Sequence, residues 1–184
     1  MNNNLGAIAR QRHYISLRHA DREVRRRTWS ISYGLPGFTT QFGTPPQPAT
    51  RHTPTSMDRA VADAKWINRG ACLACTWEGP ERHRRDEAIE DAHDHTHPGW
   101  RQLPIFHPCP SGKSAKTWQR HLESTYPEGW FDAGGPLRLY AKPPFDMHDA
   151  GAAPGGGFIL YTAYRDRVTS SALQPTLEDE GAAR

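Results

Sequence analysis

The sequence predicts an α+β fold, a small loop-rich domain built on a zinc-stapled β-hairpin plus helix, with additional short helices and strands. Hydrophobic residues make up only 36% of the chain, which also carries 16 glycines and 16 prolines. A chain of this composition has few apolar side chains for a hydrophobic core, so an additional stabilising crosslink is expected. Cys72 and Cys75 form a C-x2-C motif, and three histidines follow: His93, His95 and His97. Cysteine and histidine are the ligands that structural zinc prefers, four to a tetrahedron.

The N-terminal region is predicted to be basic and outside the core. Residues 1–14 are expected to be mobile, and a helix from Ser16 onward would carry an apolar face and a basic stripe. Residues 10–27 hold seven arginines against Asp21 and Glu23. Uneven charge of this kind favours contact with nucleic acid or another acidic surface, and a solvated helix face is the alternative. The candidate nucleic-acid contacts here are Arg18, Arg22, Arg25, Arg26 and Arg27.

Four elements are expected between this region and the cysteines. Alternation over residues 29–33 predicts a short strand. Residues 34–54 are dense in Gly, Pro and Thr, which indicates a linker or extended arm. A helix is predicted over residues 55–64, capped by its first Thr or Ser. Residues 65–72 are expected to form a strand that leads into the C-x2-C turn, with a second strand after the turn that Gly79-Pro80 ends.

The second half of the chain alternates helices and strands. A helix is predicted from Asp86 to Pro98, with Ala88, Ile89 and Ala92 on its buried face. Residues 100–106 are expected to be extended. Periodicity predicts another helix from residue 113 or 114 to Tyr126, closed by a proline. The remaining predicted strands are 137–141 and 158–164.

These elements divide the chain into a basic N-terminal region and Pro/Gly/Thr-rich arm (1–55), a zinc-binding α+β core (56–165) and a disordered tail (166–184). Three cysteines do not make a disulfide framework, so the C-x2-C motif indicates metal or redox chemistry in a reducing compartment. No apolar run approaches the roughly 20 residues that span a bilayer. The first residues contain no hydrophobic signal core, and a cytoplasmic protein without a membrane partner is expected.

The predicted zinc ligands come from the cysteine pair and the following helix: Cys72, Cys75, His93 and His97. His93 and His97 are related by i, i+4 and share a helix face. His95 lies on the opposite side and is the alternative ligand if the end of the helix frays. His107 and Cys109 are further substitutes. A reduced C-x2-C turn beside exposed histidines, with no metal, is the other interpretation, and a redox motif fits less well because no helix opens at the cysteines.

Catalytic interpretations are weaker than a structural one. The segment from Asp94 to Pro98 has the form D-H-x-x-P, which resembles the first motif of His-Asn-His nucleases, whose histidine activates water beside a divalent metal. Those enzymes need a later asparagine, and this chain has none after Asn68. Zinc deaminases need a His-x-Glu ahead of Pro-Cys-x-x-Cys, which is also missing. Zinc with four protein ligands has no open position for chemistry, so we expect that the chain is not an enzyme.

Several short motifs carry a family resemblance: CLACTW at 72–77, DAHDHTHPGWR at 91–101 and the Leu-Pro that follows. They resemble an uncharacterised zinc-finger-like domain family of actinobacteria and their phages, to which no activity is assigned. The resemblance covers roughly residues 66–140. It implies an accessory protein of a phage or mobile element, and it implies a role for His95.

The sequence therefore predicts a non-catalytic zinc-binding accessory protein that binds nucleic acid or has a regulatory role. Further candidate contacts to phosphate lie ahead of the zinc helix: Arg82, Arg84 and Arg85. The alternative is a protein-interaction adaptor that acts on a host protein through its tryptophans and glycine-rich loop. A degenerate metal-dependent nuclease of the His-Asn-His type is a further alternative. The oligomeric state stays open.

Overall fold

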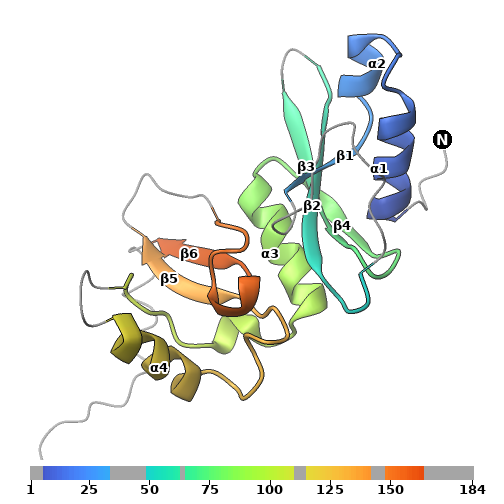
Figure 1. Ribbon diagram of the computed structural model, residues 1–184. Coiled ribbons are helices and arrows are strands. Elements are labelled where there is room, and N and C mark those ends of the chain that lie inside the picture. Colours follow the sequence, from blue (N-terminus) through green and yellow to red (C-terminus); the bar gives the residue numbers. More distant parts are fainter. Residues whose placement is uncertain (1–5, 34–48, 63–64, 110–114, 142–147, 164–184) are drawn as a thin grey trace, which may run out of the picture.

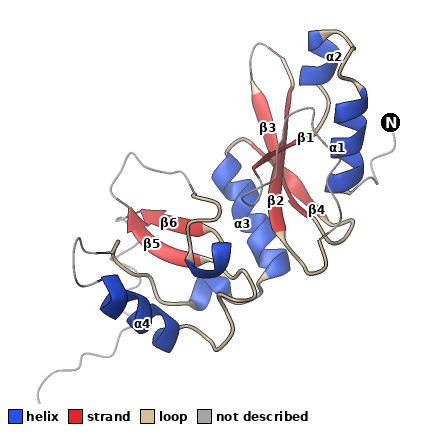
Figure 2. Ribbon diagram, viewed as in Figure 1, coloured by secondary structure: helices blue, strands red, loops and turns tan. Residues whose placement is uncertain are grey.

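A computed structural model describes residues 6–33, 49–62, 65–109, 115–141 and 148–163. Within these ranges the chain forms two units that meet at one helix (Figures 1 and 2). The first unit holds a four-stranded antiparallel sheet, and the second holds a two-stranded parallel sheet. The predicted α+β class is confirmed.

The four-stranded sheet has the order β1-β2-β3-β4 and is covered by a helix on each face (Figure 1). Its strands are β1 (Ser30–Tyr33), β2 (Pro54–Ala60), β3 (Trp66–Cys72) and β4 (Glu78–Arg82). The helices of this unit are α1 (Ala7–Ser16), α2 (Arg22–Arg26) and α3 (Arg85–Thr96). On the α1 face, buried Ala7 packs in one cluster with Ile31 and Met57. Burial of such side chains is worth about 1.5–3 kcal/mol each, so this face anchors α1 to the sheet.

The α3 face of the sheet depends on a glycine. A Cβ at Gly70 would lie 2.2 Å from the carbonyl oxygen of Ala88 and 2.9 Å from the backbone nitrogen of Ala92. The absence of a side chain therefore lets the backbone of α3 approach the middle of β3. The close approach places the last turn of α3 beside the turn that joins β3 to β4 (Figure 1).

The second unit consists of a parallel strand pair with one long helix and two short ones. Its elements are η1 (Trp100–Gln102), α4 (Ala115–Thr125), β5 (Leu137–Ala141), η2 (Pro154–Gly156) and β6 (Ile159–Ala163). Buried Leu122 of α4 packs against β5. Ile89 of α3 joins Trp100 and Phe158 in a separate buried cluster. Helix α3 is thus shared: one side packs on the four-stranded sheet and the other on the second unit.

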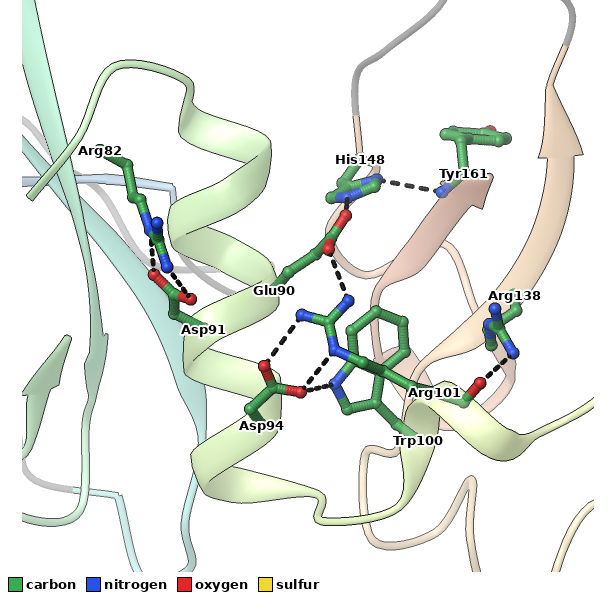
Figure 3. Close-up of polar contacts among 9 residues, drawn as sticks. All are labelled: Arg82, Glu90, Asp91, Asp94, Trp100, Arg101, Arg138, His148 and Tyr161. Atoms are coloured by element: carbon green, nitrogen blue, oxygen red, sulfur yellow. Dashed lines mark hydrogen bonds and ion pairs between the residues drawn. The ribbon is translucent and has the colours of Figure 1, made fainter. Parts of the chain in front are cut away.

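A polar network crosses the same junction (Figure 3). Arg101 donates to Asp94 at 2.9 Å and to Glu90 at 2.8 Å. The backbone N–H of Tyr161 donates to Nδ1 of His148, so the proton lies on Nε2, which donates to Glu90 at 3.2 Å. Burial acts to raise the pKa of Glu90, but the hydrogen bonds from His148 and Arg101 outweigh it and hold the pKa below its usual value. The charged carboxylate of Glu90 on α3 therefore links this helix to Arg101 and His148 of the second unit.

Most predicted elements are observed, with three corrections. The helix predicted over 55–64 is wrong: β2 occupies this segment because it pairs with β1 and β3 on its two sides, and tertiary pairing overrides a helical pattern. The N-terminal prediction is also wrong: α1 occupies Ala7–Ser16, much of which was expected to be mobile, and the helix expected from Ser16 is replaced by the shorter α2. Gly79-Pro80 lies inside β4 rather than ending it, because an edge strand tolerates proline.

Several expectations concern residues outside the described ranges. These include most of the linker predicted at 34–54 and the whole tail at 166–184. The expected boundary at 55/56 falls within β2, and β1 from the N-terminal region belongs to the same sheet as the segments that follow.

Candidate metal centre

The centre begins at the turn between β3 and β4, where both cysteines lie. The N–H of Ala74 approaches Sγ of Cys72 at 3.4 Å, and the N–H of Trp77 approaches Sγ of Cys75 at 3.5 Å. The N–H of Cys72 in turn donates to the carbonyl of Trp77 at 3.3 Å. These contacts fix the two sulfur atoms within one turn, with a backbone N–H directed at each of them.

His52 reaches the cysteines through strand pairing. In the β2–β3 register Pro54 lies opposite Cys72, and the N–H of Leu73 donates to the carbonyl of Thr53 at 3.0 Å. The chain just ahead of β2 is therefore held against the turn. This brings Nδ1 of His52 to 3.4 Å from Sγ of Cys72.

His95 arrives from the last turn of α3. Its Nε2 lies 3.3 Å from Sγ of Cys75. Its ring stacks on Trp77, with centroids 4.5 Å apart and an interplanar angle of 1°. The ring of His52 meets it edge-on, with centroids 5.1 Å apart and an angle of 74°. Three separate segments of the chain therefore converge on one point.

The four ligand atoms of His52, Cys72, Cys75 and His95 all lie within 4.8 Å of one another. Tetrahedral zinc, with bonds of about 2.3 Å to sulfur and 2.0–2.1 Å to nitrogen, would separate its ligand atoms by roughly 3.3–3.8 Å. The two sulfur–nitrogen distances of 3.4 and 3.3 Å are close to that range. Two thiolates would also balance the charge of a divalent cation. The group could thus hold a metal ion, and its chemistry is compatible with zinc.

The pKa shifts of Cys75 and His95 have opposite directions. Burial raises the pKa of the Cys75 thiol; the N–H of Trp77 opposes this shift, and the neighbouring Cys72 adds to it. A bound cation is what would deprotonate such a thiol near neutral pH. Burial lowers the pKa of His95, and nearby His52 lowers it further. His95 is therefore neutral near pH 7, in the form that binds metal.

The other two predicted ligands lie elsewhere. His93 is fully buried, with its ring centroid 5.0 Å from that of Phe158. His97 is also buried, its ring 5.5 Å from Trp130 and its Nδ1 2.9 Å from the hydroxyl of Thr96. Burial lowers the pKa of His93 well below its usual value, and the proximity of His97 adds to this shift. The pair shares a helix face, as expected, but this face packs on the second unit rather than beside the cysteines.

The choice of histidine follows from two stripes on α3. Ala88 and Ala92 approach β3, and residue 95 continues their row at i+7 and i+3. Ile89 belongs to the cluster on the opposite side, and His93 continues its row at i+4. The remaining candidates, His107 and Cys109, are exposed and lie outside the four-residue group.

The predicted nucleic-acid contacts divide into exposed and paired arginines. Arg18, Arg22 and Arg27 are exposed. Arg26 pairs with Glu23 at 3.1 Å, and Arg25 is half-buried. The arginines near the start of α3 have an acidic partner nearby or are partly buried. Arg82 pairs with Asp91 at 2.7 Å, and Arg84 lies 3.8 Å from Asp86. Arg85 is half-buried.

Fold and site together define an α+β protein with a His–Cys–Cys–His group able to hold a metal ion. Residues 6–170 match a family described as "Family of unknown function (DUF6349)", and the chain belongs to that family. The expected resemblance to an uncharacterised family is confirmed in this form. Comparison with curated proteins and with solved structures found no match. Among the described residues, no helix has the length and apolar character needed to cross a membrane.

Proposed function

We propose that this chain is a non-catalytic zinc protein that binds nucleic acid through its basic N-terminal helices. The observation that carries the zinc assignment is the convergence of four sulfur and nitrogen ligand atoms within 4.8 Å. In this proposal His52, Cys72, Cys75 and His95 hold one structural zinc ion. Four protein ligands leave no open coordination position, which favours a structural role over catalysis.

The metal would crosslink three separate segments of the chain. His52 precedes β2, the cysteines lie in the β3–β4 turn, and His95 ends α3. Cys72 is fully buried, whereas His52 is exposed at the rim. Binding free energy of such a metal becomes folding free energy, because the unfolded chain has no preformed site. The zinc-finger-like character expected from the sequence is part of this proposal.

The nucleic-acid part of the proposal rests on charge and exposure. Residues 21–27 contain four arginines and two acids, and Asp21 is engaged in accepting the N–H of Glu23 at the start of α2. Exposed Arg22 presents its guanidinium group to solvent, while exposed Arg27 lies 4.0 Å from the carboxylate of Glu23, which also pairs with Arg26. The forked guanidinium donors of arginine bind phosphate oxygens well. The surface is therefore consistent with an accessory protein of a phage or mobile element that binds nucleic acid.

The zinc assignment is tested by elemental analysis of the purified full chain. We expect one zinc per chain, and Cys72→Ser should lose both the metal and the cooperative thermal transition. Cys109→Ser is the matched control, because Cys109 is exposed and outside the group, and it should keep the metal. A folded, metal-free Cys72→Ser protein would refute the structural role.

The nucleic-acid assignment is tested by binding to random-sequence DNA at two salt concentrations. Affinity should fall steeply with salt, and Arg22→Gln should lower the slope of log K against log salt by about 0.9. Arg120→Gln, an exposed arginine on α4, is the control and should change nothing. Absence of binding to DNA and RNA would favour the protein-adaptor alternative, for which the exposed Val24 (50%) offers an apolar contact.

A further inference from the structure

One tryptophan stands apart from the others in its exposure. Trp66 keeps 45% of its surface accessible, whereas Trp29 and Trp100 are 9% and 4% exposed. Trp66 lies outside the metal centre, on a part of the sheet that the four-residue group does not use. Its position is the first residue of β3, at the far end of that strand from Cys72.

The backbone around Trp66 holds the ring at a defined place. Trp66 is paired with Ala60 at the last rung of the β2–β3 ladder. Just beyond, the N–H of Val61 donates to the carbonyl of Lys65 at 3.0 Å, and the N–H of Lys65 donates to Ala62 at 2.8 Å. The ring therefore projects from the hydrogen-bonded end of a hairpin. A ring held this way gives up little conformational entropy when a ligand stacks on it.

A cation lies over this ring. The guanidinium carbon of Arg26 lies 5.8 Å from the centroid of Trp66, which is within the range of a cation–π contact. Arg22 precedes Arg26 by four residues on α2 and shares its face. Lys65 is exposed and directly precedes the tryptophan. The described residues of this surface, 21–27 and 65–66, carry five cations and two carboxylates.

We propose that this surface, formed by Trp66, Arg22, Arg26 and Lys65, binds single-stranded nucleic acid, with a base stacked on Trp66 and phosphates on the cations. The inference rests on the proposed function and names its substrate class. A protruding aromatic ring beside positive charge is how sequence-tolerant single-strand binders work, because every base has a stacking face. Bases inside a duplex are stacked on one another, so an intact duplex offers this ring no partner.

The test compares full-length protein with single-stranded and duplex oligonucleotides of one sequence, by fluorescence anisotropy at two salt concentrations. Trp66→Ala should weaken single-strand binding about tenfold and leave its salt slope unchanged, because it removes stacking and no charge. Trp66→Tyr should restore most of the affinity. Val24→Ala is the matched control and should bind like the wild type, because Val24 is the other large apolar residue that is exposed among the described residues. Thermal unfolding should be the same for all four proteins.

The outcomes separate this inference from the proposed function. Preferential single-strand binding that depends on an aromatic residue at position 66 supports the inference. Equal binding of both forms, unchanged in Trp66→Ala, overturns it and leaves nucleic-acid binding through the arginines intact. No binding of either form overturns the inference and the proposed function together.

Discussion

The imidazole of His95 lies parallel to the indole of Trp77, with ring centroids 4.5 Å apart and planes 1° from each other. The same tryptophan offers its backbone N–H to Sγ of Cys75, at 3.5 Å. One residue therefore orients two members of the candidate metal centre. Because Trp77 follows the cysteine pair by two positions, the turn that places the sulfurs also places the platform on which His95 rests.

Removal of this platform should weaken metal binding without removing a ligand. Trp77→Ala is expected to lower zinc affinity about tenfold, the low end of what loss of a supporting contact costs. Trp77→Phe keeps a flat ring and should recover most of the affinity. Competition with a chromophoric chelator measures both variants. Equal affinities for Trp77→Ala and wild type would show that stacking does not orient His95.

The histidines should differ in their effect on metal content. His52→Ala and His95→Ala each remove a ligand atom from the group of four and should leave the purified chain with little zinc. His97→Gln keeps a buried polar side chain on the other face of α3 and should retain one zinc per chain. Native mass spectrometry reports the stoichiometry directly. Zinc lost in His97→Gln but kept in His95→Ala would reinstate the ligand pair expected from the sequence.

The Glu90 network should make stability depend on pH. The folded-state pKa of Glu90 lies below its usual value, so its contribution is present above the unfolded-state pKa and is lost as pH falls through the folded-state pKa. Glu90→Gln should cost about 1 kcal/mol at pH 7, since Arg101 and His148 lose a charged acceptor at a partly exposed site. The cost should shrink toward pH 3. Urea unfolding of Glu90→Gln and wild type side by side at pH 7 and pH 3, with excess zinc in every sample, measures it.

Glu87→Gln provides the control for that experiment. Glu87 is exposed on the same helix, and its substitution should leave the unfolding free energy nearly unchanged at both pH values. A Glu90→Gln cost that stays constant between pH 7 and pH 3 would mean that Glu90 acts through packing rather than charge.

Gly70 should tolerate no side chain. Gly70→Ala would place Cβ 2.2 Å from the carbonyl oxygen of Ala88, and backbone atoms cannot move aside as a flexible side chain can. We expect a loss of about 3 kcal/mol, at the upper end for overpacked sites. Gly79→Ala is the comparison: its nearest neighbour is the Trp77 side chain at 3.1 Å, so the cost should be smaller. Similar unfolding midpoints for the two variants would contradict the close approach of α3 to β3.

Local patterns predicted much of the secondary structure. The helix at 85–96, the helix at 115–125 and the strand at 137–141 follow from caps, periodicity and turn residues that lie next to them in the chain. The helix predicted over 55–64 is wrong because the apolar spacing of this segment fits a helix, while the segment pairs with β1 and β3 in the sheet. Assigned as a strand, it would pair with 66–72 across a short turn.

That assignment would also have led to His52. Pairing of Ala60 with Trp66 sets Pro54 opposite Cys72, so the residues just before Pro54 meet the cysteine turn. The sequence does indicate two short strands joined by one turn. A histidine in a proline-rich arm, however, has no local pattern that shows which end of a strand it lies beside. Its place in the metal centre comes from antiparallel register, and register depends on which face of the sheet is buried.

By itself the sequence determined the α+β class, because composition and periodicity are properties of neighbouring residues. It also determined that two cysteines share one turn and that three histidines follow on one helix. Only the tertiary structure decided which histidine meets the cysteines. A helix presents His95 and His93 to opposite sides whatever its surroundings. The approach of Ala88 and Ala92 to Gly70 and the packing of Ile89 in the cluster with Phe158 decide which side faces the turn.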